Sequence, residues 1–252
     1  MCIRDRAIIP VHLGGQCIDN EKIYHKAKKL GIRIIEDGAH AMGTTYKTKK
    51  KLISTGSCKH SLMTCFSLHP IKTITTGEGG VVTTNNKELR NRLMSLRNHG
   101  ILRNKKFSPW YYEINEIGYN YRMTDISAAI GRVQLSKLDG FNTRRREIAN
   151  RYNEALAEHV QIPEDRRGHV FHQYTIRCKQ RDQLQSHLRE NGVGTGIYYP
   201  SLLYHYSPMS DLKMPCPNAE RLVSEVLSLP VHPSLTDEDV SAVIETTTSF
   251  FR

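Results

Sequence analysis

The sequence predicts an α/β protein in which a large α/β domain is followed by a small α+β domain. Near the start, a strand-like apolar run, an amphipathic helix and a second apolar run form a βαβ unit. Alternating strands and helices continue for over 100 residues, and the pattern changes after Val170. We therefore expect a large domain over residues 7–139, a connecting helix over 140–160 and a small domain over 161–252.

Short runs rich in β-branched or aromatic residues predict the strands. The expected strands are Ala7 to Leu13, Ile32 to Glu36, Met63 to Ser67, Val81 to Thr84, Phe171 to Cys178 and Gly196 to Tyr199. Residues 43–61 are polar and rich in Gly and Lys, which indicates a connection between strands.

Apolar residues at helical spacing predict the helices. The expected helices are Asn20 to Leu30, with Asp19 or Asn20 as the N-cap, Lys87 to Asn98, Asp125 to Leu138, Leu138 to Leu156, Arg181 to Asn191 and Asp237 to Phe250. Small residues at 128, 129 and 131 favour close packing of one helix face. A break or bend is expected near Gly140.

The composition favours a soluble cytoplasmic protein over a secreted, membrane or nucleic-acid-binding one. Lys and Arg number 36 against 25 Asp and Glu, but the basic runs at residues 47–51 and 144–146 lack interleaved aromatic residues. Six cysteines without dense spacing indicate a reducing compartment. No apolar run is long enough to cross a bilayer. We therefore expect no nucleic-acid and no membrane partner.

Three side-chain types that pyridoxal phosphate requires occur close together. An amine forms the aldimine, a carboxylate keeps the pyridine nitrogen protonated, and hydroxyl groups bind the phosphate. Lys72, Asp37, which follows a predicted strand, and Ser67, five residues before the lysine, could supply them. Each also has an ordinary interpretation: a surface charge, a turn cap and a strand-end serine.

A zinc site is an alternative, because thiolates and imidazoles are the ligands that zinc prefers. The candidates are Cys58, His60, Cys65 and His69. Their spacing lacks a Cys-x-x-Cys knuckle, so no metal is expected. A zinc-stabilised binding module remains the alternative that metal analysis would identify.

Two strings resemble the DegT/DnrJ/EryC1/StrS sugar aminotransferases. They are residues 36–43 (Glu-Asp-Gly-Ala-His-Ala-Met-Gly) and residues 66–80 (Phe-Ser-Leu-His-Pro-Ile-Lys-Thr-Ile-Thr-Thr-Gly-Glu-Gly-Gly). Residues 97–100 and 118–125 are also similar to family motifs, and the likeness extends over nearly the whole chain from Ala7. The resemblance implies the fold type I architecture of the aspartate aminotransferases, and a homodimer with shared active sites.

The resemblance also implies roles for individual residues. Lys72 would form the aldimine, Asp37 would pair with the pyridine nitrogen, His40 would lie beside the cofactor ring and Ser67 would bind the phosphate. Asn120 would reach the phosphate bound to the other subunit. The phosphate-binding turn and stacking aromatic of the family's opening segment have no counterpart, so we expect a chain incomplete at its N-terminus.

The expected reaction moves an amino group from L-glutamate to a 4-keto sugar nucleotide. Residues 57–64 and 109–113 are most similar to the UDP-4-amino-4,6-dideoxy-N-acetyl-β-L-altrosamine transaminases of pseudaminic acid synthesis, although Leu62 departs from an expected aspartate. Alternatives are a transaminase for another UDP- or dTDP-keto sugar, and a regulator that binds the cofactor without turnover. Arg122 is a candidate for substrate binding, with an ion pair to Asp125 as its alternative.

Overall fold

A computed structural model describes the chain in five stretches, residues 5–48, 51–102, 108–164, 168–212 and 215–252. The chain divides into two compact units. Unit 1 comprises Met1–Leu13 and Cys17–Leu138, and unit 2 comprises Gly14–Gln16 and Asp139–Arg252. The expected domain boundaries stay a prediction.

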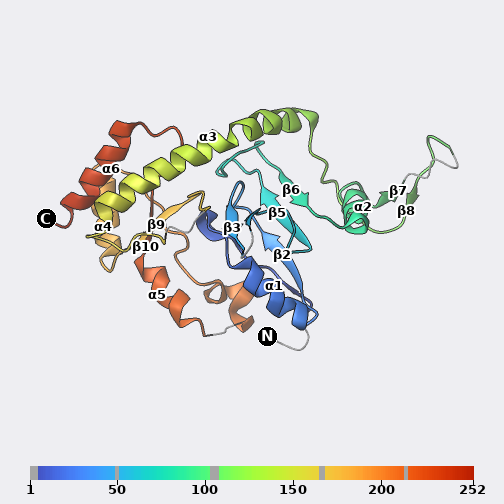
Figure 1. The fold of residues 1–252 in the computed structure, drawn as a ribbon, viewed down its shortest axis with the longest axis horizontal. Helices are drawn as coiled ribbons and strands as arrows, with labels where there is room; N and C mark the ends of the chain where they lie inside the picture. Colours follow the sequence, from blue (N-terminus) through green and yellow to red (C-terminus); the bar gives the residue numbers. More distant parts are fainter. Residues whose placement is uncertain (1–4, 49–50, 103–107, 165–167, 213–214) are drawn as a thin grey trace. The chain divides into compact units, whose positions relative to one another are not determined.

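Unit 1 is built on a four-stranded sheet with the order β1-β2-β5-β6 (Figure 1). Its strands are β1 (Ala7–Ile8), β2 (Arg33–Asp37), β5 (Met63–Ser67) and β6 (Gly80–Thr83). The first three strands run parallel, and β6 returns antiparallel beside β5. The helix α1 (Asn20–Lys29) connects β1 to β2, so the predicted βαβ unit is confirmed.

The remaining elements of unit 1 are short. They are β3 (Thr45–Lys47) and β4 (Leu52–Ser54), which form an antiparallel hairpin, α2 (Lys87–Leu96), and the antiparallel pair β7 (Ile101–Leu102) and β8 (Glu113–Ile114). A 3-10 helix, η1 (Leu13–Gly15), follows β1, and α3 (Asp125–Leu156) begins in unit 1 and ends in unit 2.

Unit 2 packs helices against a two-stranded antiparallel sheet. Its elements after α3 are β9 (Tyr174–Arg177), α4 (Arg181–Glu190), the 3-10 helices η2 (Leu203–His205) and η3 (Ser207–Leu212), α5 (Pro217–Glu225), β10 (Val226–Leu229) and α6 (Asp237–Ser249). The core joins the last turns of α3 to both strands and to α4 and α6. Tyr152, Tyr174 and Leu184 are fully buried in it.

Several local predictions are confirmed and others are wrong. Asp19 caps α1, because its side chain accepts a hydrogen bond from the Lys22 amide. The strand predicted over residues 7–13 ends at Ile8. Pro10 has no amide hydrogen for the ladder, although its carbonyl still accepts from the Asp37 amide and Val11 forms an isolated bridge to Asp37.

Of the break or bend expected at Gly140, the break is wrong, because α3 is continuous through that residue, and the bend stays a prediction. One glycine costs a helix only about 1 kcal/mol, which a 32-residue helix tolerates. The polar connection over residues 43–61 contains the unpredicted β3–β4 hairpin. The strand predicted over residues 196–199 is reduced to one bridge between Gly196 and Ser228.

The strand β2 carries one buried carboxylate, that of Glu36. Glu36 is 2% exposed and accepts hydrogen bonds from His12 Nε2 at 2.8 Å, Asn20 Nδ2 at 2.9 Å and Thr64 Oγ1 at 3.3 Å. Burial by itself raises the pKa of Glu36, but the hydrogen bonds, that from His12 first, hold it below its ordinary value. The folded protein therefore stabilises the ionised carboxylate.

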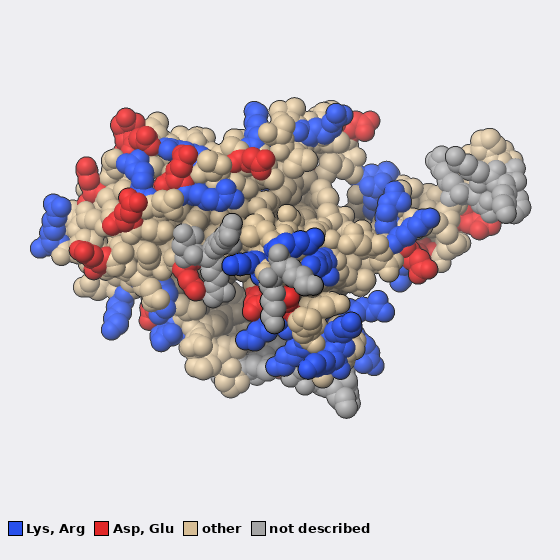
Figure 2. Space-filling model, in the orientation of Figure 1, with Lys and Arg blue, Asp and Glu red and all other residues tan. Residues whose placement is uncertain are grey.

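Basic side chains are spread over much of the face seen in Figure 2, with acidic ones among them. Four lysines come from α1, at positions 22, 26, 28 and 29. Among the described residues, no helix combines the length and the apolar character needed to cross a bilayer.

Candidate active site

The candidate site begins at the carboxyl ends of β2 and β5, where parallel sheets gather their ligands. Asp37 is the last residue of β2 and pairs with Cys65 on β5. Side chains alternate along a strand, so Asp37, Cys65 and Ser67 share one face of the sheet. Glu36 and Thr64, which contact each other, lie on the opposite face. The sheet therefore presents one carboxylate, one thiol and one hydroxyl to the site.

Asp37 also has the turn-capping role that the sequence allowed. Its Oδ1 accepts a hydrogen bond from the Ala39 amide at 3.0 Å. Within the described parts of the chain, no donor is placed on Oδ2. Asp37 is half-buried, and Gly38, which follows it, is buried. The carboxylate is thus fixed by one oxygen and can receive a donor on the other.

Lys72 lies in the loop of residues 68–79 that connects β5 to β6, here called the Lys72 loop. The two strands close the loop through the pairing of Ser67 with Gly80. Leu68 closes it further, since its amide donates to the Gly79 carbonyl and its carbonyl accepts from the Thr76 amide and the Thr75 hydroxyl. The loop that presents the lysine is therefore folded on itself.

The charges of Lys72 and Asp37 affect the pKa of His40, and the charge of Asp37 affects the pKa of Lys72. Burial lowers the pKa of Lys72, and the Asp37 carboxylate opposes that effect. The pKa of His40 is lowered to about 4, first by burial and then by the charge of Lys72, against the opposing effect of Asp37. His40 is therefore a neutral ring at pH 7, beside a half-buried amine and a carboxylate.

Ser67 has a geometry that suits phosphate binding. Its Oγ accepts a hydrogen bond from the His69 amide at 3.3 Å. A hydroxyl has one proton to donate, and a bond accepted from an amide leaves that proton available. The hydroxyl can therefore donate to an anion while its oxygen stays anchored.

These side chains fit pyridoxal phosphate. The amine has a lowered pKa, the carboxylate has one oxygen without a donor, the histidine ring is neutral and the serine hydroxyl has an available proton. They match the aldehyde, the pyridine nitrogen, the ring and the phosphate respectively. The assigned roles stay predictions, supported by the electrostatic effects that Asp37, His40 and Lys72 exert on one another.

Asn120 belongs to a different part of unit 1. It is exposed and forms an antiparallel bridge with Asn98. Within the described residues, no hydrogen bond joins it to Asp37, Ser67 or Lys72. Arg122, next along this segment, donates from Nη1 to Asn98 Oδ1 at 2.8 Å instead of forming the considered ion pair with Asp125.

The residues considered for zinc make other contacts. Cys58 Sγ lies 3.2 Å from the Thr83 carbonyl, His60 Nδ1 lies 3.0 Å from the Tyr46 hydroxyl, and His69 Nδ1 accepts from the Ile71 amide at 3.3 Å. Burial, followed by the Asp37 charge, raises the pKa of Cys65, which disfavours a metal-binding thiolate. Across the described stretches, no three His, Cys, Asp or Glu side chains are grouped to hold a metal ion.

Sequence reasoning missed two residues that shape the Lys72 loop. The first is His69, whose ring accepts from the loop backbone. The second is Gln134 on α3, whose Oε1 accepts a hydrogen bond from the Thr75 amide at 3.3 Å. Gln134 is 59 positions away in sequence, so only the fold reveals its contact. His69 precedes Pro70, a turn signal that could have suggested its role.

Comparisons with known proteins identify the family of the chain. Residues 3–248 match the DegT/DnrJ/EryC1/StrS aminotransferase family. The chain belongs to that family. The fold predicted for it, that of pyridoxal-phosphate-dependent fold type I enzymes, is confirmed. Members of the family are pyridoxal-phosphate-dependent aminotransferases that act on sugars.

Two curated relatives and two solved structures illustrate the similarity. The "Pleiotropic regulatory protein" of Geobacillus stearothermophilus is 38% identical over 261 residues, which are 99% of this chain and 66% of the relative. "Spore coat polysaccharide biosynthesis protein SpsC" of Bacillus subtilis is 35% identical over 264 residues, which cover 96% of this chain and 66% of SpsC. The chain thus spans slightly less than two thirds of their length.

The structures are similar over almost the whole chain. PseC of Helicobacter pylori, described as an aminotransferase of pseudoaminic acid biosynthesis, has a TM-score of 0.89 at 27% identity, covering 98% of this chain and 67% of PseC. DesV of S. venezuelae, solved in complex with a ketimine intermediate, has a TM-score of 0.88 at 32% identity. The match covers 99% of this chain and 66% of DesV.

Proposed function

We propose that the protein is an aminotransferase that moves an amino group from L-glutamate to a 4-keto sugar nucleotide with pyridoxal phosphate. The observation that carries the proposal is that Asp37 ends β2 and Lys72 lies in the loop that follows the neighbouring strand β5. The electrostatic effects among Lys72, Asp37 and His40 agree with this placement. Family membership supports the reaction class. A half-buried amine whose pKa is lowered by burial gives up its proton more readily than an exposed lysine does, which suits a residue that moves protons.

Each residue has a proposed task. Lys72 would hold the cofactor covalently and, once released, carry a proton between the substrate carbon and the cofactor carbon. Asp37 would keep the pyridine nitrogen protonated, and Ser67 would bind the phosphate. When bound, pyridoxal phosphate would supply a ring that withdraws electrons from the substrate carbon. His40, neutral at pH 7, would lie beside that ring without competing, as a cation, with the protonated pyridine nitrogen for the Asp37 carboxylate.

Asn120 suggests a homodimer with shared sites. Its exposed position, beside Asn98, is compatible with a role in the other subunit's site. We assign it to the cofactor phosphate of a partner subunit. A cytoplasmic location completes the proposal, supported by free thiols at the five described cysteines.

The proposed acceptor is UDP-4-keto-6-deoxy-N-acetylhexosamine, as in a pseudaminic acid-type pathway. Similarity to PseC supports this choice, whereas the name of SpsC connects a related chain with spore coat polysaccharide biosynthesis. Another UDP- or dTDP-keto sugar is the alternative. Purified protein should be offered both classes with L-glutamate, and 2-oxoglutarate release should be measured. A preference for dTDP sugars would refute the UDP assignment.

The covalent role of Lys72 has a direct test. Protein incubated with pyridoxal phosphate should gain a visible absorbance band that borohydride abolishes, with the label found on Lys72 by peptide mass spectrometry. Lys72→Ala should lose the band and the turnover, whereas Lys179→Ala, at an exposed lysine in unit 2, should keep both. Transamination by the Lys72→Ala protein would end the proposal.

A second candidate function is regulation without turnover. The name of the Geobacillus stearothermophilus relative motivates it. Such a protein would share Lys72 and Asp37 and would bind the cofactor. It would release no 2-oxoglutarate with any keto sugar, so turnover separates the two functions.

A further inference from the structure

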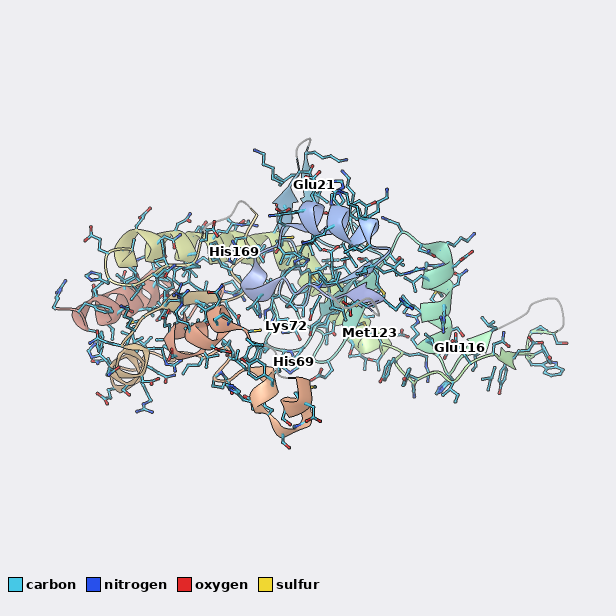
Figure 3. All side chains as sticks on the ribbon, turned by 90° about the horizontal axis from the view of Figure 1, so that it is seen from below. Glu21, His69, Lys72, Glu116, Met123 and His169 are labelled. Carbon is cyan, nitrogen blue, oxygen red and sulfur yellow. The ribbon has the colours of Figure 1, made fainter. Side chains whose placement is uncertain are left out.

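His69 is the residue around which the turn before Lys72 is organised. Its amide donates to Ser67 Oγ at 3.3 Å, and its carbonyl accepts from the Lys72 amide at 3.0 Å. Its ring nitrogen Nδ1 accepts from the Ile71 amide at 3.3 Å. One residue therefore contacts both Ser67 and Lys72, to which separate tasks were assigned above. Figure 3 labels His69 and Lys72, which come from the same loop.

The ring contact fixes how His69 must be protonated. An imidazole nitrogen that accepts a hydrogen bond carries no proton, so the proton of the neutral ring lies on Nε2. Nε2 lies 3.8 Å from Glu78 Oε1, near the other end of the Lys72 loop. Both of these side chains are well exposed, with 44% and 81% accessible. The contact with Glu78 is therefore weak, and the bond to Ile71 is the structural one.

The hydrogen bond from the Ile71 amide to His69 Nδ1 constrains the backbone of this turn. Pro70 has no amide hydrogen, so the first amide after His69 that the ring can reach is that of Ile71. The bond joins residues two apart, as in the side-chain turns that Asn forms with its own backbone. The turn directs the chain so that the Lys72 amide meets the His69 carbonyl. Without the ring acceptor, the first half of the loop would lose a local constraint.

We propose that His69 is a positioning residue, whose Nδ1 holds the turn that places the Lys72 amine and the Ser67 hydroxyl for one and the same cofactor. The inference rests on the function proposed for Lys72. His69 itself touches neither cofactor nor substrate in this role. It acts through the backbone of Ile71 and through the two residues that it joins.

Two substitutions of His69 distinguish the contribution of Nδ1 from that of Nε2. His69→Asn keeps an acceptor at the position of Nδ1 and removes the group at Nε2. His69→Gln places its amide near Nε2 and lacks the acceptor at Nδ1. Glu78→Gln is the control for the exposed contact. The full chain is used for all variants, and circular dichroism with thermal unfolding checks that each is folded.

The first measurement is the affinity for pyridoxal phosphate, followed by borohydride trapping on Lys72. We expect the Asn and Glu78→Gln variants to stay within about twofold of the wild type. The Gln variant should bind about tenfold more weakly, the factor that one hydrogen bond is worth. Equal affinity of the Gln and wild-type proteins would overturn the inference, as would equal weakening of the Asn and Gln variants.

The second measurement needs no cofactor. The reaction of Lys72 with an amine-selective reagent is followed against pH by peptide mass spectrometry. Burial is the main cause of the lowered Lys72 pKa, so a loosened turn should move its titration toward the ordinary lysine value in the Gln variant only. Unchanged titration in that variant would contradict the positioning role. Failure to trap the cofactor on wild-type Lys72 would instead refute the proposed function.

Discussion

Replacing Glu36 by Gln should destabilise unit 1, and the structure gives the size of the effect. Three donors converge on the carboxylate: His12 Nε2 and Asn20 Nδ2 on Oε2, and Thr64 Oγ1 on Oε1. The Gln side chain has nearly the same volume. Its oxygen can replace Oε2, and its NH₂ group can face Thr64, whose hydroxyl can reverse and accept.

The substitution therefore removes the negative charge of residue 36 and keeps most of its hydrogen bonds. A hydrogen bond to a charged group contributes about 1.5–3 kcal/mol, against about 1 kcal/mol for a neutral one. Losing that difference at the two bonds to Oε2 reduces the free energy of unfolding by about 2 kcal/mol. Relief of the buried charge acts in the opposite direction. The lowered pKa of Glu36 indicates that the hydrogen bonds outweigh it.

The lowered pKa of Glu36 also determines how the stability difference between the two proteins depends on pH. A carboxyl group whose pKa is depressed by folding contributes stability above its ordinary value of about 4.3, and the contribution is lost as the pH falls through the folded pKa. The difference between wild type and Glu36→Gln should thus be largest at pH 7. It should shrink toward zero below about pH 4.

Urea unfolding followed by far-ultraviolet circular dichroism measures the difference. Fluorescence is a poor probe, because the single tryptophan, Trp110, is 77% exposed. Two units can unfold separately, so amide exchange of β2 should localise the loss. Glu88→Gln, at an exposed carboxylate of α2, should cost less than about 1 kcal/mol. A Glu36→Gln protein as stable as wild type at pH 7 would refute the reasoning.

Three further predictions concern single residues. Gly38→Ala should cost about 1–3 kcal/mol and weaken cofactor binding, measured by urea unfolding and titration, because the new Cβ would lie 2.9 Å from Phe66 Cε1. Gly140→Ala should stabilise the protein by about 0.5–1 kcal/mol in thermal unfolding, because α3 is continuous and no atom lies within 4 Å of the added Cβ; a loss of stability would contradict this. His40 should titrate near pH 4 by NMR, and its contribution to stability should fall as the pH drops from about 6.5 through that value; a midpoint above 6 would refute its burial.

The sequence predicted elements whose pattern is long or strongly apolar. Periodicity located α1 and α2, and the Asp19 cap could be read directly. The β3–β4 hairpin was missed because each strand has three residues and buries only its central side chain, Tyr46 or Ile53. The break at Gly140 was predicted from composition, whereas packing and helix propagation on both sides decide the outcome.

The candidate site was partly predictable because its chemistry needs particular residue types. An amine and a carboxylate in apolar surroundings indicated Lys72 and Asp37 before their proximity was known. The neutral state of His40 depends on burial, which spacing does not reveal. The contacts of Gln134 and of the His69 ring depend on the path of the loop. The roles of Gln134 and His69 in the loop can therefore be recognised only from the folded structure.

The two edge strands of the sheet have a practical consequence for handling the protein. Within the described residues, β1 and β6 each leave one side of the backbone without a neighbouring strand. Val81 and Val82 on β6 are 42% and 44% exposed, and Ile9, just after β1, is 62% exposed. Unpaired edges with apolar side chains invite strand addition from another molecule. Preparations of this 252-residue chain should therefore be tested for concentration-dependent self-association before any kinetic result is interpreted.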